Sequence, residues 1–572
     1  KTENLFNGQS RTASGKRLTV ELTANPDWYA VQALPVVGNP LTDDAVAWAT
    51  AYYANRLAGV LVEANPAISR VFESWKQSGK DQETLMSNLE KNSDLKDLLL
   101  AETPWVAEAA DEAEQKRRIA LLFDLNGMSS RLQQAADKLR TLQLTDGSWS
   151  WYKGMKGSRY ITTQTVELMA RLKAMNISLT DGMEAQYGRA LGYLRKEVKK
   201  VYEQMRIQER ENNIQVRPDE QIVKYLYICA LDETARKQAD KEINTYFLAR
   251  LTNRSAECSI YEKSLLAVIM HAYGQKRQAE LLLQSVKEYM LATPEMGRYF
   301  DTSKAGYSWN SYKIPTQVAA MEAIWRIAPD QHLLGDMKQW LLKQKQVQVW
   351  DSPLATADAV YAFLGMGGNR LQASGSLKAR IGSKTLVTPD DALGYVRQTY
   401  TGADTEVSRI AVVKSGEGLS WGAVYAQYLE DMIRVRPFRT NGLGIVREYW
   451  LGDEQVSAST RLKPGDKLIV RLTVKADRDM DFVQIKDERA SCMEPAVQLS
   501  GYHWNGGIGY YQVNKDASTE FFIDQMRKGT YVLEYTVYLD RPGTYQAGIA
   551  TIQSAYAPEF NGHTDGVELT IE

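Results

Sequence analysis

The hydrophobic pattern of this 572-residue chain changes its period twice along the sequence. Apolar and polar residues alternate over residues 17–22, which is the period of a half-buried strand. From about residue 40 to 365 apolar residues recur every three or four positions, which predicts helices, most clearly over 46–62, 167–174, 264–273 and 355–364. Alternation returns over 467–474 and 530–539, between turn sequences that contain Pro and Gly. We therefore expect a short β segment, a long all-α region and a terminal β-sandwich.

Charge and metal-ligand content exclude several functional classes. The chain has 69 Lys and Arg against 70 Asp and Glu, so it lacks the positive field that nucleic-acid binding requires. Three cysteines are too few for a disulfide framework. The four histidines, His271, His332, His503 and His563, are too scattered to build a local zinc site. We expect no nucleic-acid partner, no metal and no cofactor.

Membrane-spanning and targeting segments are not evident. The most apolar stretch, residues 45–64, is interrupted by Asn55, Arg56 and Glu63, which predicts a helix packed in a domain core. The chain starts at Lys1 without a signal sequence, so we expect a processed product or a piece of a longer protein. Any membrane association is then expected to come from an anchor outside this segment.

A loose repeat of tryptophan-bearing turns runs through the helical region. Residues 147–151 (GSWSW) precede 161–169, residues 306–310 (GYSWN) precede 314–321, and residues 350–353 (WDSP) precede 356–361. In each copy the turn leads to a Thr that we expect to cap a helix. Repeated helix pairs either stack as a solenoid or close as a ring. The tryptophans either pack the repeat or line a ligand groove, and this possible binding rim consists of Trp149, Trp151, Trp309 and Trp350.

No catalytic motif is recognisable, so we assign no catalytic residues and expect a protein that is not an enzyme. Asp43-Asp44 and Asp390-Asp391 fit helix caps or turns. Glycoside hydrolysis needs only two carboxylates across a cleft, which keeps an enzyme as an alternative. The polar candidates near the Trp-bearing turns are Asp146, Lys153, Lys156, Arg159, Asp301, Lys304, Lys313 and Asp351, of which the aspartates at 146 and 351 fit turns that bond their own backbone.

Several short motifs follow one another in a set order. They are residues 147–151 (GSWSW) with 163–166 (TQTV), 350–361, 441–449 (NGLGIVREY), 465–470 (GDKLIV), 479–487 (DMDFVQIKD), 529–535 (GTYVLEY) and 542–545 (PGTY). This order resembles the C-terminal half of bacterial alpha-2-macroglobulin-like proteins. The resemblance implies a multidomain α and β fold, in which residues 1–36 and 368–430 form one CUB-like β domain. An α/α toroid, a terpenoid-cyclase-like helical ring, occupies 37–367 as an insertion, and a macroglobulin-like β-sandwich occupies 431–572. Residues 17–35 are then expected to pair with strands beyond Gly368.

The resemblance also implies a function. It points to a protease-trap or endopeptidase-inhibitor-like protein of the periplasm or cell surface, whose partners are proteases or other proteins and upstream domains of its own longer chain. In that family the toroid usually carries a Cys-x-Glu-Gln thioester near its first helix, which captures the protease covalently. The equivalent stretch here, residues 38–46, contains no Cys, Glu or Gln, and the nearest match, Cys492-Met493-Glu494-Pro495, has no glutamine and lies in the β-sandwich. We therefore expect a thioester-free toroid without covalent capture. The alternative is a toroid that binds or degrades carbohydrate through the possible binding rim.

Overall fold

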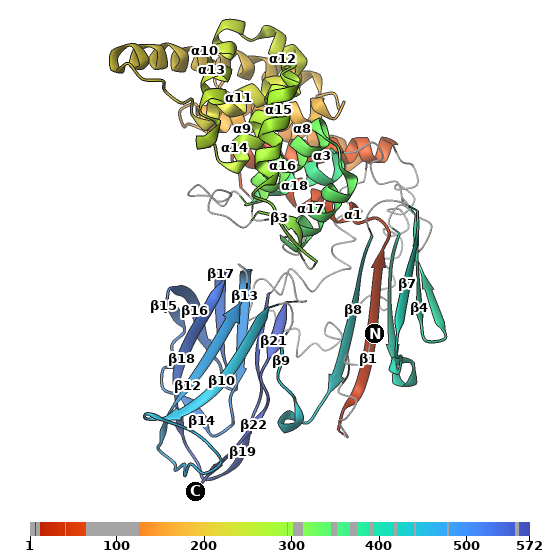
Figure 1. Ribbon diagram of the computed structural model, residues 1–572, viewed down its shortest axis with the longest axis vertical. Helices are drawn as coiled ribbons and strands as arrows, with labels where there is room; N and C mark the ends of the chain where they lie inside the picture. Colours follow the sequence, from red (N-terminus) through yellow and green to blue (C-terminus); the bar gives the residue numbers. More distant parts are fainter. Residues whose placement is uncertain are drawn as a thin grey trace.

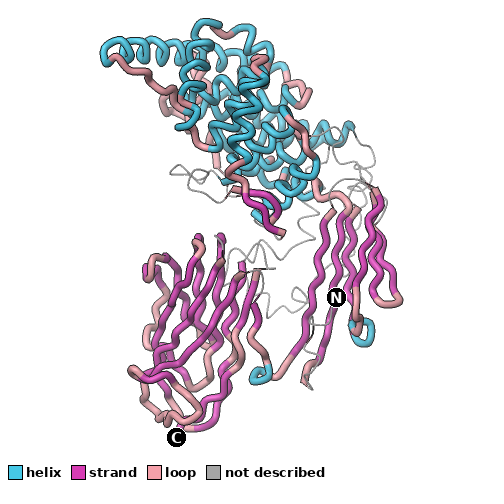
Figure 2. The backbone as a smooth tube through the Cα atoms, in the orientation of Figure 1, coloured by secondary structure: helices cyan, strands magenta, loops and turns pink. Residues whose placement is uncertain are grey.

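The computed structural model separates helices from strands into distinct parts of the molecule (Figures 1 and 2). The residues that the structure describes are 6, 12–31, 33–40, 42–64, 125–294, 296–300, 313–344, 350, 352–366, 375–388, 394–416, 420–439, 442–477, 480–554 and 560–572. The chain as a whole is a mixed α and β protein with a helical middle and β structure toward both ends.

The first β part is built from segments that lie far apart in sequence. Its elements are β1 (Ser14–Thr23), β4 (Ser376–Ile381), β5 (Lys384–Val387), β6 (Tyr395–Thr401), β7 (Ile410–Ser415) and β8 (Trp421–Leu429). Strand β1 is the centre of a β6-β1-β8 sheet and pairs with both neighbours antiparallel, as in Val20↔Gln398 and Val20↔Val424. The pairing expected for residues 17–35 is thus confirmed for 17–23, whereas α1 (Trp28–Val31) and α2 (Leu34–Val37) are helical.

The alternating pattern of β1 places its apolar side chains on one face. Leu18, Val20 and Leu22 are buried against Leu377 and Ala379 of the second sheet, which has the order β5-β4-β7. Two small sheets therefore share one apolar core, although β1 and its partners are separated by the whole helical region.

The helical part forms a closed cycle. Its elements are α3 (Ala45–Ala64), α8 (Leu125–Leu142), α9 (Arg159–Ala174), α10 (Asp181–Asn212), α11 (Glu220–Leu231), α12 (Glu233–Gln238), α13 (Lys241–Asn253), α14 (Ile260–Ala272), α15 (Lys276–Lys287), β2 (Leu291–Thr293), β3 (Gly297–Tyr299), α16 (Lys313–Ile327), α17 (Gln331–Gln344) and α18 (Pro353–Leu364). Helices α3, α9, α11, α14, α16 and α18 contact one another in that order, and α18 returns to α3. Helices α8, α10, α15 and α17 pack against members of this cycle from outside.

Burial separates the inner helices from the outer ones. Every residue of α9 from Ile161 to Leu172 is buried, as expected for a helix surrounded by other helices. Helix α10 buries only a stripe that includes Met183, Tyr187 and Leu194, which is the pattern of a helix with one face in water. The predicted core helix at 45–64 is confirmed as α3 and is mostly buried. Among the described helices, none combines the length and the apolar character needed to span a membrane.

The C-terminal part is a β-sandwich. Its strands are β9 (Phe438–Arg439), β10 (Leu443–Leu451), β11 (Glu454–Gln455), β12 (Lys467–Ala476), β13 (Met480–Glu488), β14 (Met493–Pro495), β15 (Gly501–Asn505), β16 (Ile508–Asn514), β17 (Ser518–Met526), β18 (Gly529–Leu539), β19 (Gly543–Ala547), β20 (Ala550–Ser554), β21 (Asn561–His563) and β22 (Val567–Ile571). One sheet has the order β11-β10-β12-β18-β14, and the other has the order β15-β16-β17-β13-β20-β21-β9. The strands predicted at 467–474 and 530–539 are confirmed as β12 and β18, which pair side by side.

Candidate functional site

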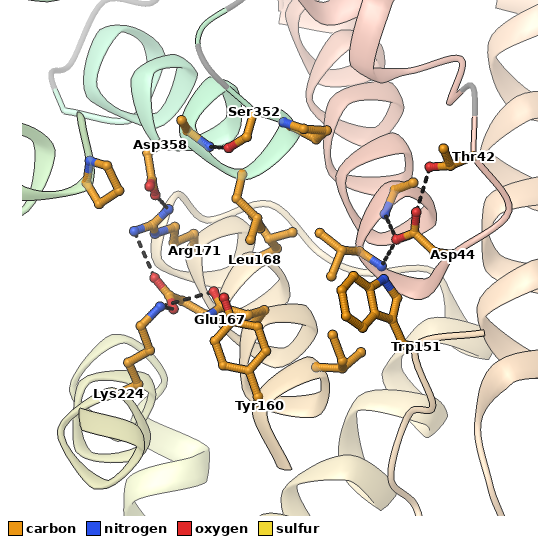
Figure 3. Close-up of a pocket in the computed structure, with 18 of the residues that line it drawn as sticks. Thr42, Asp44, Trp151, Tyr160, Glu167, Leu168, Arg171, Lys224, Ser352 and Asp358 are labelled. Carbon is orange, nitrogen blue, oxygen red and sulfur yellow. Dashed lines mark hydrogen bonds and ion pairs between the residues drawn. The ribbon is translucent and has the colours of Figure 1, made fainter. Parts of the chain in front are cut away.

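A pocket of about 590 Å³ lies where several helices of the cycle begin (Figure 3). Each of four helices starts with a side chain that caps it, namely Asp44 for α3, Ser158 for α9, Ser259 for α14 and Ser352 for α18. The second residue after each cap lines the pocket, and these residues are Val46, Tyr160, Tyr261 and Leu354. The helices therefore present equivalent positions of their first turns to one shared cavity.

The Trp-bearing turns are tied to the helix starts by matching hydrogen bonds. The backbone N–H of Trp149 donates to Thr162 Oγ1 at 2.8 Å, and that of Trp350 donates to Thr356 Oγ1 at 3.0 Å. Both threonines lie in the first turn of their helix, four residues after the capping Ser. The expectation that Thr caps these helices is therefore wrong for α9 and α18, because a Ser takes that role and Thr fixes the preceding turn.

Glycine at position 147 is required by this turn. Gly147 has a φ of 93°, and an added Cβ would lie 2.4 Å from the carbonyl oxygen of Arg189. Only a residue without a side chain allows the turn to approach α10 so closely. The turn also reaches α3, because the N–H of Ala45 donates to the carbonyl oxygen of Trp151 at 2.9 Å.

The structure corrects two members of the possible binding rim. Trp149 and Trp350 are 0% and 1% exposed, and their indole N–H groups donate to the carbonyl oxygens of Leu139 and Leu341. Both side chains pack the repeat, and their burial closes them to a ligand.

The other two members of the possible binding rim are Trp151 and Trp309. Trp151 is 47% exposed, lines the pocket and stacks on Tyr152, with ring centroids 5.8 Å apart. The predicted Trp309 lies outside the described residues.

The floor of the pocket carries a chain of buried charges (Figure 3). Lys224 of α11 donates to Glu167 of α9 at 3.1 Å, and the other oxygen of Glu167 pairs with Arg171 at 2.9 Å. Arg171 also pairs with Asp358 of α18. Two cations and two carboxylates from three helices therefore compensate one another at the end of the cavity.

The charge cluster continues into the interior of the helical cycle. Arg171 lies over the ring of Tyr361, 4.9 Å from its centroid. Tyr361 donates to Glu322 of α16 at 2.8 Å, and Arg326 donates to the same carboxylate at 2.7 Å. Tyr227 of α11 also donates to Glu322. Polar contacts thus join α9, α11, α16 and α18 across the centre of the cycle.

The pKa values of the two carboxylates of the floor are shifted in opposite directions. Burial opposes ionisation of Glu167, but Lys224 and Arg171 together outweigh it and hold its pKa below the usual value. Burial raises the pKa of Asp358 above its usual value, and the attraction of Arg171 does not offset this.

The sequence did not lead us to predict these residues of the pocket floor as functional candidates. Gln164, Glu167 and Arg171 follow one another at helical spacing within a segment that is otherwise typical of a buried helix. Polar residues in such an apolar segment are a signal of a buried network. Their partners, Lys224 and Asp358, are 57 residues and more than a hundred residues away, and no local pattern connects them.

The polar candidates of the enzyme alternative that the structure describes do not converge at the pocket. Asp146 accepts hydrogen bonds from the N–H and the hydroxyl of Ser148, which confirms the predicted turn aspartate. Arg159 pairs with Asp219 at 2.9 Å, while Lys153 and Lys156 are exposed. Asp44 caps α3, as the cap prediction for Asp43-Asp44 requires. Lys313 begins α16. The remaining candidates, Asp301, Lys304 and Asp351, and the predicted cap or turn at Asp390-Asp391, lie outside the described residues.

The segment equivalent to a thioester in the resemblance leads directly into the pocket. Thr42 donates to Asp44 at 2.6 Å, and Asp44 in turn accepts from the N–H groups of Val46 and Ala47. The cysteines of the chain lie elsewhere and are buried, and burial raises the pKa of Cys229 to about 12. Cys258 and Cys492 also have pKa values raised by burial. In the described part of the chain no cluster of His, Cys, Asp and Glu is arranged to hold a metal ion.

Comparison with known proteins places the terminal β-sandwich in a defined family. Residues 442–559 match the family model of the bacterial alpha-2-macroglobulin MG10 domain. An alpha-2-macroglobulin homolog of Nostoc sp. (strain PCC 7120 / SAG 25.82 / UTEX 2576) is 22% identical over 484 residues, which are 77% of this chain and 23% of that protein. Circularly permutated Ras protein 2 of Dictyostelium discoideum is 25% identical over 172 residues, 29% of this chain and 4% of that protein. The chain thus spans about a quarter of the Nostoc protein and far less of the Dictyostelium protein.

Solved structures similar to this chain include alpha-2-macroglobulins from Escherichia coli and Salmonella. The Escherichia coli protein from domain MG7 to the C-terminus has a TM-score of 0.35 at 14% identity and covers 98% of this chain and 78% of its own. The Salmonella protein reacted with methylamine has a TM-score of 0.38 at 13% identity, covering 98% and 32%. The trypsin-activated Escherichia coli protein has a TM-score of 0.41 at 12% identity, covering 98% and 34%. The MG10 match and the long alignment with the Nostoc homolog show that the chain is similar to bacterial alpha-2-macroglobulins.

Proposed function

We propose that this chain is the C-terminal part of an alpha-2-macroglobulin-like protease trap that retains its targets without a covalent bond. The proposed partners are proteases or other proteins, together with upstream domains of its own longer chain. The proposed location is the periplasm or the cell surface. The MG10 match supports this role, because it lies at the position expected from the order of parts along the chain.

We propose the following domain organisation for this role. Residues 1–36 and 368–430 form a CUB-like β domain, and residues 37–367 form an inserted α/α toroid. Residues 431–572 form the macroglobulin-like β-sandwich. The pairing of β1 with β6 and β8 supports the insertion, and the cycle from α3 to α18 supports the toroid.

The observation that carries the non-covalent mechanism is the chemistry of the segment before α3. A thioester joins a cysteine sulfur to a glutamine carbonyl, so it requires both side chains close together. Residues 38–46 supply neither of them, and Asp44 uses both carboxylate oxygens to cap α3 and to bond Thr42. None of the three cysteines of the chain is followed by glutamine at the spacing of the family motif. Capture through this chain must therefore depend on non-covalent contacts.

The carbohydrate alternative has weaker support. Sugars are bound by stacking on exposed aromatic faces, and two of the four predicted tryptophans are buried. The carboxylates Glu167 and Asp358 at the floor are tied to Lys224 and Arg171, which leaves no opposed pair free for hydrolysis at that place. Protein capture therefore remains the function that we propose.

The test is complex formation by the full-length protein with an active endopeptidase such as trypsin. We expect a complex that elutes early from a size-exclusion column under native conditions. In SDS the same complex should release the protease completely. A protease band that stays attached in SDS would contradict non-covalent capture. Failure to form any complex, together with turnover in a screen of polysaccharides, would instead support the carbohydrate alternative.

A further inference from the structure

The pocket at the helix starts offers hydrogen-bond donors that the surrounding protein leaves unused. Gln164 of α9 lines the pocket and is 5% exposed. Lys224 donates to its Oε1 atom at 3.0 Å, and because an ammonium group only donates, this contact fixes which end of the amide faces Lys224. Within the described residues the Nε2 group of Gln164 has no hydrogen-bond acceptor. Two N–H groups at a nearly buried position are therefore available to an occupant.

Lys224 adds a further donor at the same place. Lys224 is 4% exposed, and its ammonium group has three N–H bonds, of which it uses two on Gln164 and Glu167. The same group lies 5.7 Å from the centroid of the Tyr261 ring at the pocket wall. Both oxygens of Glu167 are already engaged, one by Lys224 and one by Arg171. An occupant on this side of the pocket must therefore accept hydrogen bonds.

The surroundings of Gln164 and Lys224 favour an anion as that acceptor. The five charged side chains that line the pocket, Asp44, Glu167, Arg171, Lys224 and Asp358, carry one net negative charge. However, Asp44 is engaged by Thr42 and by the N–H groups of α3, and both oxygens of Glu167 are engaged by cations. Four helices, α3, α9, α14 and α18, direct their N-terminal first turns at the cavity, and each N-terminus carries a partial positive charge. Asp358 uses one oxygen for Arg171, and its second oxygen would repel an anion placed at the α18 side. This asymmetry orients an anion toward Gln164 and Lys224.

The walls of the pocket specify the rest of the ligand. Trp151, Tyr160, Leu168 and Leu354 supply aromatic and aliphatic surface from three different segments. The volume of about 590 Å³ falls in the range of pockets that hold small molecules. A ligand that complements both the hydrogen-bond donors and the apolar walls of the pocket has one anionic group and an apolar body.

We propose that this pocket binds organic carboxylates, with the carboxylate on Gln164 Nε2 and Lys224 Nζ and the apolar body against Trp151, Tyr160 and Leu354. Two sources share this chemistry, the free C-terminus of a peptide that ends in an apolar residue and a small aromatic or aliphatic acid. The proposal does not rest on protease capture, because it follows from the donors, the charges and the walls of the pocket alone.

The test uses three probes and isothermal titration calorimetry on the intact chain. N-acetyl-phenylalanine represents the peptide C-terminus, 3-phenylpropanoate represents the simple acid, and N-acetyl-phenylalaninamide lacks the carboxylate. We expect both acids to bind at least tenfold more tightly than the amide. Tighter binding of N-acetyl-phenylalanine than of 3-phenylpropanoate would assign the site to peptide termini, and equal binding would assign it to small acids. Equal binding of the amide and the acids, or no binding of any probe at millimolar concentration, would overturn the proposal.

Variants locate the binding site on the chain. Gln164→Glu keeps the size of the side chain and its contact with Lys224, but it replaces the N–H donors with a carboxylate. We expect it to weaken binding of both acids at least tenfold. Gln238→Glu adds the same charge at an exposed position that contacts Arg195, and it should leave binding unchanged. Trp151→Ala should weaken all three probes alike, because it removes wall area without changing the donors.

Folding of the variants is checked separately by circular dichroism and thermal unfolding. Unchanged acid binding by a folded Gln164→Glu variant would contradict the proposed donor role. If Gln164→Glu does not fold, Trp151→Ala still tests the proposal. This variant keeps the hydrogen-bond donors, so it must still bind the acids more tightly than the amide.

Discussion

The backbone N–H of Trp149 donates a hydrogen bond of 2.8 Å to the hydroxyl oxygen of Thr162, thirteen residues further along the chain. Trp350 and Thr356 repeat this contact at 3.0 Å with a spacing of six residues. The same two residue types, Trp and Thr, therefore fix a turn to the first turn of a helix at two places in the cycle. The segments between the Trp and the Thr differ in length.

Removing the Thr162 hydroxyl tests whether this contact stabilises the helical part. In Thr162→Val the N–H of Trp149 loses its acceptor inside the core, and we expect the free energy of unfolding to fall by about 1–3 kcal/mol. Thr163→Val is the matched control, because the Thr163 hydroxyl bonds only to Arg159 in its own helix and its loss should cost less. Thermal and urea unfolding followed by helical circular dichroism measure both variants. Equal losses of unfolding free energy in the two variants would show that the hydrogen bond from Trp149 to Thr162 stabilises the protein no more than a hydrogen bond within the helix does.

Amine treatment tests the absence of an internal acyl bond. A thioester reacts with methylamine and releases a thiol, whereas this chain lacks the Cys and Gln pair near α3. We expect the intact mass to be unchanged after incubation with methylamine. We also expect Cys229 to react with iodoacetamide only after unfolding, because it is buried and its pKa is raised to about 12. A stoichiometric amine adduct would refute this expectation.

The ion pair between Glu209 and Arg250 predicts a specific pH dependence. Arg250 donates to both oxygens of Glu209, at 2.7 and 2.8 Å, and lowers the pKa of Glu209 to about 2 from the ordinary 4.5. A depressed folded-state pKa contributes stability above pH 4.5, and this contribution is lost as pH falls toward 2. Wild type should therefore be more stable than Glu209→Gln at pH 7, and the difference should shrink between pH 4.5 and 2.

The measurement for this prediction is urea unfolding at several pH values. Glu211→Gln is the control, since Glu211 is exposed on the same helix. A difference between wild type and Glu209→Gln that stays constant down to pH 2 would contradict the assigned role of Arg250.

A buried ion pair holds the two sheets of the C-terminal β-sandwich together. Arg447 of β10 donates to Asp487 of β13 at 2.6 Å, and Tyr535 of β18 donates to the other oxygen of Asp487 at 2.7 Å. Both charged side chains are 1% exposed. We expect Asp487→Ala to destabilise the sandwich by about 3–5 kcal/mol, because it leaves the Arg447 charge buried without a counterion. Tyr535→Phe removes only one hydrogen bond and should cost about 1 kcal/mol. Hydrogen exchange of amides in β12, β13 and β18 measures the destabilisation in each variant. Equal protection in Asp487→Ala and Tyr535→Phe would contradict the proposed cost of leaving Arg447 without a counterion.

Strand β1 should control the stability of strands more than 350 residues away. Val20 is fully buried in the core that β1 shares with β4, and it pairs with residues of β6 and β8. We expect Val20→Asp to increase amide exchange in β4, β6 and β8 while the helical part keeps its protection. Val413→Asp introduces the same charge at a 66% exposed position of β7 and should have little effect. Retained protection of β6 and β8 in Val20→Asp would show that they do not depend on β1.

Local sequence patterns were sufficient to predict several of the helices and strands, although residues 28–31 and 34–35, which were expected to pair with strands, are helical. Two-residue alternation identified β1, β12 and β18, and helical spacing identified α3, α9, α14 and α18, because these periods follow directly from backbone geometry. The absence of Cys and Gln from residues 38–46 could also be read without a structure. The capping residues were harder to assign, since Ser and Thr both occur near each helix start and only the fold shows which one accepts the helix N–H groups.

The candidate site depended on tertiary structure. Trp149 and Trp151 are two residues apart in one turn, yet the first is buried and the second lines the pocket. The charge cluster joins Arg171 to Asp358 across 187 residues of sequence. The sequence by itself determined the order of strands and helices and the absence of a Cys-x-Glu-Gln motif from the given residues. Only the closed cycle of helices decided which first turns share a cavity and which buried charges meet. Such contacts arise from packing between distant segments, and neither segment shows them as a periodic pattern in its own sequence.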